Sequence, residues 1–523
     1  MNRSSLAHAF GLLLLASALA ACATPPPARR DVVIGLVGEP SSVFADDPAA
    51  RVIAGAVVEP LVARDAHDEY VPRLVREVPT FENGGLRVTQ DGGARLVATF
   101  RLRDDARWQD GEPITAQDIR FAYEADAAAP AGSEARWIAD RVETVDVVDE
   151  RIARVTYRAG ERWDGYAVAP RVLPRHILAN ADAGTRGAYE REPVHAGAFS
   201  VAAWVRGYGV TLAAFPGYVG GVPALGRLEV RFFADRTAVL AALRNGEIDI
   251  APSPALEADL ARTLDRFGDT NRLDVLYRDI EAIDVLRFGR TGKFSEQLVR
   301  KAVELTIDRQ AIVNDIFAGR ARIPRSYLVP PLWAAAEVAP ATRPDRDGAR
   351  ALLAQAGFRK GRFGILERDI ERMTATILVA VGSPTRMDVA RRIAGDLAAV
   401  GIAIDVRARP SDEVAGVIAK GDFDMALTPE DADDAAVATE RWTGLVDPWF
   451  DVLALAARRA PGRDEKRPLY AELQRIWSDA LPGLPIYQHL RVDVAARSLT
   501  GIQAPPRDAA LTWNAAAWRF GVP

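Results

Sequence analysis

The chain has 523 residues, of which 49% are apolar, and a formal net charge of −5 at neutral pH. This length exceeds what a single hydrophobic core supports, so two or three lobes are expected. The acidic balance and the absence of a long Lys/Arg run argue against a nucleic-acid surface, which needs a concentrated basic patch.

The first 22 residues are typical of a secretory signal. Arg3 is followed by an apolar stretch that is too short for an ordinary membrane span, and Leu19-Ala20-Ala21-Cys22 closes it. Cys22 is the only cysteine, so no internal disulfide can form. The four closing residues resemble a bacterial lipobox, which implies that Cys22 is lipidated and becomes the first residue of the mature protein. An ordinary signal peptide that happens to contain a cysteine is the alternative.

The folded part is expected to begin near Asp31. The Pro-rich segment 23–30 before it predicts a stiff, extended tether. A continuous apolar run from Asp31 predicts a buried strand, and alternating apolar residues over 96–102 predict a second one. Asp110-Gly111 indicates a turn, and Thr115 begins a helix with an acidic first turn.

Helix-to-strand units recur later in the chain. Asp235 is placed to cap a helix that ends at Gly246 before a short strand. Ser383 is placed to cap a second helix, which ends near Gly401 and is followed by a strand over 402–406. Repeated units of this kind predict α/β lobes.

Motifs for catalysis and metal binding are missing. The chain has no Gly-x-Ser-x-Gly, His-Glu-x-x-His or Gly-x-Gly-x-x-Gly sequence. Its histidines show no metal-ligand spacing; they are His8, His67, His176, His195 and His489. We therefore expect a protein that is not an enzyme and has no cofactor or metal. A hydrolase using a carboxylate pair is the least favoured alternative, because sequence alone cannot show which carboxylates face each other.

The stretch 100–121 resembles the signature of the family 5 extracellular solute-binding proteins. These are the peptide, dipeptide and nickel receptors of bacterial ABC importers. The matching residues are Phe100, Leu102, Arg103, Trp108, Asp110, Gly111, Pro113, Thr115, Ala116, Asp118, Ile119 and Phe121. Similar blocks follow the family order at 58–62, 71–75, 173–178, 242–249, 299–310 and 349–358. The resemblance runs from about residue 31 to about residue 490.

The resemblance implies an α/β, bilobed periplasmic-binding-protein-like fold with an extra inserted domain. The first lobe is expected over 31–63, 192–278 and 484–523, the inserted domain over 64–191 and the second lobe over 279–483. Most of the motifs read as scaffold, and Trp108 in particular is expected to anchor a turn against a core.

The implied function is capture of a peptide or similar small polar solute in the cleft between the lobes. Hinge closure then precedes docking on an ABC permease in the inner membrane. The protein is expected to act as a monomer, to bind no nucleic acid, and to lie in the periplasm or at the cell surface, anchored to the membrane by lipid. A periplasmic sensor or chaperone without a transport role, built on the same fold, is the alternative.

The expected ligand site departs from the family pattern. In peptide-binding relatives, a Trp-x-x-Asp-Tyr-x-Asp-Pro segment pairs its first Asp with the peptide amine. Here Leu445 stands at that position. A buried amine needs a carboxylate partner. One of four carboxylates is expected to take this role, with Asp434 and Asp447 favoured; the four are Asp431, Asp433, Asp434 and Asp447. A structural turn is the alternative for Asp447.

Other residues are expected to line the ligand. They are Trp442, Thr443, Gly444, Tyr487 and Phe44. His195 replaces part of a glycine-rich family block, and it is either a loop side chain or a ligand group.

Overall fold

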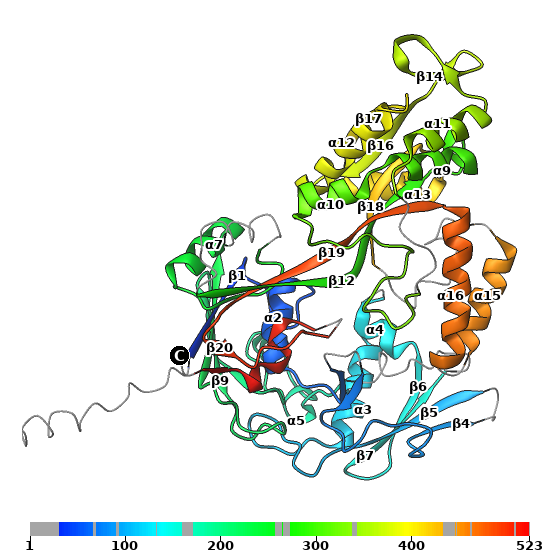
Figure 1. Ribbon diagram of the computed structural model, residues 1–523. Coiled ribbons are helices and arrows are strands. Elements are labelled where there is room, and N and C mark those ends of the chain that lie inside the picture. The colour runs from blue at the N-terminus through cyan, green and yellow to red at the C-terminus, as the bar shows by residue number, and fades with distance from the viewer. Residues whose placement is uncertain are drawn as a thin grey trace, which may run out of the picture.

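The computed structural model (Figure 1) describes residues 31–65, 69–89, 94–131, 133–158, 171–256, 264, 272–336, 343–431, 445, 447–460, 463–506 and 509–521. The predicted signal peptide, lipobox and tether lie outside these residues. Within the described ranges, no helix combines the length and the hydropathy that a bilayer crossing requires.

A ten-stranded sheet runs through the molecule. Its strands are β1 (Asp31–Val37), β8 (Phe199–Val205), β9 (Gly209–Ala214), β10 (Arg227–Phe233), β11 (Ile250–Ala251), β12 (Leu273–Phe288), β16 (Thr374–Ala380), β17 (Ala403–Arg409), β18 (Met425–Asp431) and β19 (Gly483–Ala496). Their order is β17-β16-β18-β12-β19-β11-β1-β10-β9-β8. Two lobes form around the two ends of this sheet, and β12 and β19 lie between them (Figure 1).

The first lobe surrounds the β1 end of the sheet. β1 is the predicted buried strand, and it pairs in parallel with β10 and β11. Helices α2 (Pro48–Val57) and α7 (Arg236–Asn245) pack against these strands. As predicted, Asp235 caps α7, and Gly246 ends it at φ 73°, where a residue without Cβ is favoured.

The inserted domain is built on an antiparallel sheet of order β4-β5-β7-β6. Its strands are β4 (Leu86–Thr89), β5 (Arg95–Arg101), β6 (Val142–Val147) and β7 (Ile152–Tyr157). α3 (Ala116–Ala127) begins at the predicted cap, where Thr115 N donates to Asp118 Oδ2 at 2.8 Å. Trp108 is fully buried in this core, which fits its predicted role as an anchor. α4 (Glu134–Ala139) lies beside α3.

The second lobe surrounds β16, β17 and β18, which run in parallel. Its helices are α9 (Gln297–Thr306), α10 (Arg309–Phe317), α11 (Arg346–Gln355), α12 (Pro384–Ala398) and α13 (Ser411–Lys420). Ser383 caps α12, as predicted. A small sheet of β13 (Arg359–Lys360), β14 (Leu366–Arg368) and β15 (Glu371–Arg372) adjoins this lobe, and helices α15 (Pro448–Arg459) and α16 (Arg463–Ala480) pack together around a core that includes Phe450 and Trp477.

Shorter elements complete the described chain. They are β2 (Val62–Arg64), β3 (Tyr70–Pro72), α5 (Arg175–Leu178), α6 (Ala183–Tyr189), β20 (Leu499–Thr500), β21 (Arg519–Phe520) and 3₁₀ turns at Lys293–Ser295, Arg362–Gly364 and Leu511–Ala517. Every described element and hydrophobic core lies from Asp31 onward.

The two lobes are joined by the long antiparallel pair β12 and β19. β19 pairs with β11 near its carboxyl end, and β12 pairs with β18 from Ala282 onward. The β12–β19 ladder shifts register between Asp279 and Ile283, which face Leu490 and Gln488. Three residues of β12 therefore bulge opposite one residue of β19. The bilobed α/β fold is thus as predicted, whereas the predicted residue boundaries of the lobes stay a prediction.

Candidate functional site

The carboxyl ends of β1, β10 and β11 meet at one edge of the first lobe. α2 and α7 also begin there, capped by Asp47 and Asp235, each of which accepts a backbone N–H. In open parallel sheets, ligands bind outside this edge. A cavity of about 410 Å³ lies at the edge, lined by Leu36, Val37, Gly38, Glu39, Pro40, Asp47, Pro48, Ala49, Arg236, Pro252, Ser253, Pro254 and Ala255.

Glu39 is a carboxylate of this cavity. Trp204 Nε1 donates to one of its oxygens and the backbone N–H of Gly207 donates to the other, both at 2.8 Å. The hydrogen bond from Trp204 holds the pKa of Glu39 below its ordinary value, so the group is an oriented anion. Sequence reasoning missed Glu39. A carboxylate two residues after the end of a buried strand was the signal that could have found it.

Four side chains form a cluster at the facing edge of the second lobe. Asp284 of β12 is fully buried, and both of its oxygens accept from Arg386, with Nε at 2.8 Å and Nη2 at 3.1 Å. Tyr487 and His489 of β19 bring the Tyr hydroxyl and His Nε2 to the same carboxylate, at 2.7 and 2.8 Å. Arg386 reaches it from the first turn of α12, just after β16. We call these four residues the Asp284 cluster.

The electrostatics of the Asp284 cluster favour its charged form. Burial alone raises the pKa of the Asp284 carboxyl, but hydrogen bonds from His489 and Arg386 and their charges hold that pKa below its usual value. Burial also disfavours the Arg386 cation, yet the pair with Asp284 raises the Arg386 pKa. The hydrogen bonds of the Asp284 carboxylate are therefore made within the protein. Arg386 and His489 remain 12% and 24% exposed, so the Arg386 guanidinium can meet a ligand anion.

Tyr487 and Phe44, two of the residues predicted to line the ligand, pack against other aromatic rings of the protein. The Tyr487 ring lies 5.4 Å from the His489 ring and 4.3 Å from the Phe317 ring, so it is a buried member of the Asp284 cluster. Phe44 stacks on Tyr189, with ring centroids 5.7 Å apart. Phe44 thereby packs against two hydrophobic cores, the one that contains β1 and the one that contains Tyr189.

Two of the four predicted amine partners, Asp431 and Asp447, lie in the described part of the chain. Asp447 Oδ1 accepts from the backbone N–H groups of Trp449 and Phe450, so it caps α15. Asp431 ends β18 as an exposed residue opposite Ala282. Leu445 packs against the core of α15 and α16. The predicted residues that lie outside the described part of the chain are Cys22, Asp433, Asp434, Trp442, Thr443 and Gly444.

His195 lies in a core. Its ring meets the Trp108 ring edge-on at 5.5 Å, and its Nδ1 accepts from the backbone N–H groups of Glu59 and Ala196, at 3.3 and 2.9 Å. Burial lowers the pKa of His195 to about 3. This geometry fits a neutral structural residue. Among the described residues, no group of three or more His, Cys, Asp or Glu is arranged to hold a metal ion.

Comparison with known proteins decides the family. The model of the bacterial extracellular solute-binding proteins, family 5 Middle, matches residues 71–443, which is more than half of the chain. The chain belongs to this family. Family 5 is the family that the stretch 100–121 predicted.

Named relatives of this family 5 protein span most of its length. Protein XP55 of Streptomyces lividans is 27% identical over 489 residues, which cover 88% of this chain and 84% of that protein. Oligopeptide-binding protein AppA of Bacillus subtilis is 24% identical over 75% of this chain and 74% of AppA. The structure of NikA from Brucella suis in complex with Fe(III)-EDTA superposes with a TM-score of 0.77 at 18% identity, over 94% of this chain and 100% of NikA. The structural likeness shows the fold.

Proposed function

We propose that this family 5 protein is the substrate-binding lipoprotein of an ABC importer. It captures a peptide or similar small polar solute between its lobes, closes about a hinge and delivers the solute to a permease in the inner membrane. Membership of a solute-binding family supports capture, and the relative AppA, an oligopeptide-binding protein, supports a peptide-like solute. Lipidation at Cys22 anchors the protein in the periplasm or at the cell surface.

One observation carries this proposal. In each lobe, the edge of the sheet next to the crossing strands β12 and β19 holds a charged group. Glu39 lies on one edge, and the partly exposed guanidinium of Arg386 lies on the other. A zwitterionic solute such as a peptide has an amine for the first edge and a carboxylate for the second. A ligand favours closure only when it contacts both lobes better in the closed state, and a zwitterion meets this condition.

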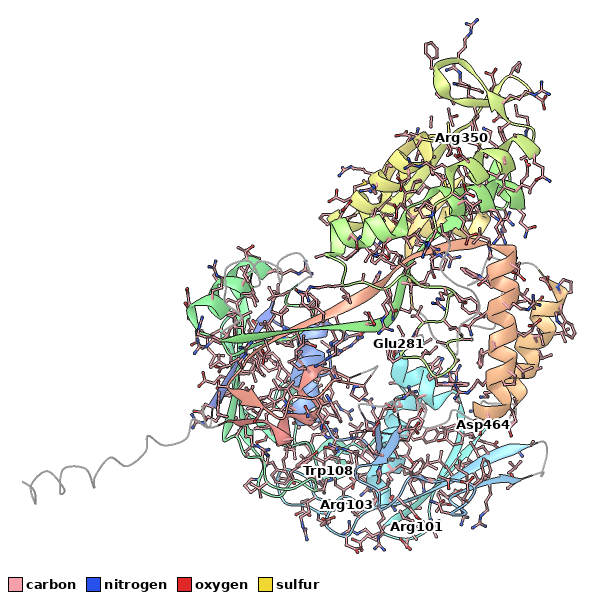
Figure 2. All side chains as sticks on the ribbon, in the orientation of Figure 1. Arg101, Arg103, Trp108, Glu281, Arg350 and Asp464 are labelled. Atoms are coloured by element: carbon pink, nitrogen blue, oxygen red, sulfur yellow. The ribbon has the colours of Figure 1, made fainter. Side chains whose placement is uncertain are left out.

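The hinge is proposed at the bulge of β12. Extra residues interrupt the β12–β19 ladder there, which weakens the pairing at the point where the strands pass between the lobes. Figure 2 labels Glu281, a residue of this bulge, on that stretch of β12. Within the Asp284 cluster, His489 lies opposite the bulge and Asp284 follows it by two residues, so a rotation there moves the second-lobe edge relative to Glu39.

Native mass spectrometry of protein purified without refolding tests the proposal first, because a retained solute is seen directly. That solute, added to ligand-free protein, should compact it in small-angle scattering and raise its melting temperature, as binding to the native state requires. Deleting the gene should abolish uptake of the solute. If no peptide or small polar solute binds, capture is the wrong function. If a solute binds but uptake is unchanged, the sensor or chaperone role replaces import.

A further inference from the structure

The small sheet β13-β14-β15 lies at the far end of the second lobe (Figure 1). Its turns present two large apolar side chains to solvent. Phe363 is 88% exposed and Ile370 is 99% exposed. Both have left-handed backbone, with φ of 60° and 67°. This conformation is disfavoured for residues with a Cβ, and for β-branched Ile it is an outlier. Both residues lie in tight turns whose neighbouring central residues, Gly364 and Asp369, are left-handed too, so the turns account for this backbone. The exposure of two large apolar side chains at these turns is what favours a binding role.

The same segment carries unbalanced positive charge. Residues 359–372 include five cationic and three acidic side chains. Arg368 forms an ion pair with Glu296 through two hydrogen bonds of 2.7 and 3.0 Å, and Glu371 forms an ion pair with Lys293 at 2.5 Å. Glu367 and Asp369 are the remaining acids. Four exposed cations have no ion pair with any described residue: Arg359, Lys360, Arg362 and Arg372.

A groove continues this surface toward the body of the lobe. Its volume is about 710 Å³, and it lies between the turn at Gly364 and the carboxyl end of α12. Leu353, Phe358 and Leu366 contribute apolar lining, with Arg350 beside them. Figure 2 shows Arg350 in the part of the second lobe remote from β12. Because α12 starts at the Asp284 cluster and runs away from it, this surface is separate from the proposed solute site. We call Phe363, Ile370 and the four cations the distal tip.

We infer that the distal tip binds an anionic phospholipid surface. Exposed apolar side chains beside Lys and Arg are the combination that enters the headgroup region of a bilayer and attracts acidic lipids. Phe363 and Ile370 lie on separate turns at the two ends of β14, so a fluid interface can accept both without a preshaped pocket. The chain as a whole has a charge of −5, so an acidic surface attracts the tip while it repels the rest of the molecule.

Vesicle sedimentation of residues 31–523, which contain every described element, tests the tip without the proposed anchor. Binding should be at least about tenfold stronger to vesicles with phosphatidylglycerol than to pure phosphatidylcholine, and it should weaken as salt rises. The double variant Phe363→Asn with Ile370→Gly suits left-handed backbone, so it should fold well and still lose roughly tenfold in binding. Neutralising Arg359, Lys360 and Arg362 together should lose more. Val222→Ser, at another exposed apolar residue, is the matched control.

The full lipidated chain supplies a second measurement. On phosphatidylglycerol vesicles, backbone amides over 361–372 should be protected from hydrogen exchange, whereas on phosphatidylcholine vesicles they should not. Equal binding of wild type and tip variants, or no preference for the acidic lipid, overturns the inference. If the tip variants instead lose docking on the permease in neutral-lipid discs, and wild type ignores acidic vesicles, the partner is an acidic protein and the inference is wrong.

Discussion

Asp284 and Arg386 form a two-point ion pair in which the carboxylate is fully buried and the guanidinium is 12% exposed. The two residues come from β12 and from the first turn of α12. Together with Tyr487 and His489, the pair ties the crossing strands to the sheet edge of the second lobe. A buried charge that loses its partner is costly, so this contact should matter for stability as well as for ligand binding.

Arg386→Leu should lower the free energy of unfolding by about 3 kcal/mol, because it leaves Asp284 buried with only His489 and Tyr487 as partners. Urea denaturation measures the change. The matched control is Arg407→Leu, which breaks an ion pair of 2.6 Å with Asp405 whose members are 53% and 60% exposed. That change should cost less than about 1 kcal/mol. Equal losses in the two variants would contradict the assigned role of the buried pair.

His195 should make stability depend on pH. Its folded pKa is about 3, whereas an unfolded His titrates near about 6.5. The unfolded chain therefore binds more protons between these values, and stability falls as the pH drops through this window, by up to about 1.4 kcal/mol per pH unit. In His195→Asn the amide oxygen can accept the same backbone N–H groups, so the slope should flatten. Urea midpoints at pH 7.5, 6, 5 and 4 check this, and an unchanged slope in the variant would refute it.

Glu39→Gln should weaken binding of an amine-bearing solute at least about tenfold while leaving the melting temperature nearly unchanged. A charge partner that is desolvated on lobe closure is worth roughly 2 to 5 kcal/mol, whereas a rim charge is worth far less. Calorimetric titration with the co-purified solute measures the loss. Asp46→Asn is the control, since that carboxylate is nearby and 92% exposed. Wild-type affinity in the Glu39 variant would remove it from the site.

The four carboxylates predicted from sequence can be tested in the same titration. Single Asn substitutions at Asp431, Asp433, Asp434 and Asp447 separate a ligand partner from solvated acids. Asp447→Asn should also lower stability by about 1 kcal/mol or less, because an Asn cap replaces an Asp cap with little loss. If all four variants and the Glu39 variant bind like wild type, the solute has no buried amine.

Cys22→Ser should abolish lipidation. Cells labelled with a radioactive fatty acid should show label on the wild-type protein and none on the variant, and the variant should move from the membrane fraction to the soluble periplasmic fraction. Equal labelling would leave Leu19-Ala20-Ala21-Cys22 as part of an ordinary signal peptide.

Local chemistry made much of the fold predictable. The strand at Asp31, the caps at Thr115, Asp235 and Ser383 and the helix end at Gly246 all follow from interactions within a few residues, and the structure contains each of them. The motifs over 100–121 are likewise contiguous. Their family therefore could be recognised before any tertiary contact was known, and the bilobed fold came with it.

The candidate site could not be predicted in this way. In the Asp284 cluster, Arg386, Tyr487 and His489 are separated from Asp284 by 102, 203 and 205 positions in the sequence. Glu39 and Trp204 are separated by 165 positions. The sequence predicted Tyr487 as a residue that lines the ligand, but it did not predict that the Tyr487 hydroxyl donates to Asp284. Sequence alone determined the family and the ends of several helices and strands, because those depend on neighbouring residues. Only the tertiary structure decided which charges meet, because strand register and lobe packing bring distant side chains within hydrogen-bond reach.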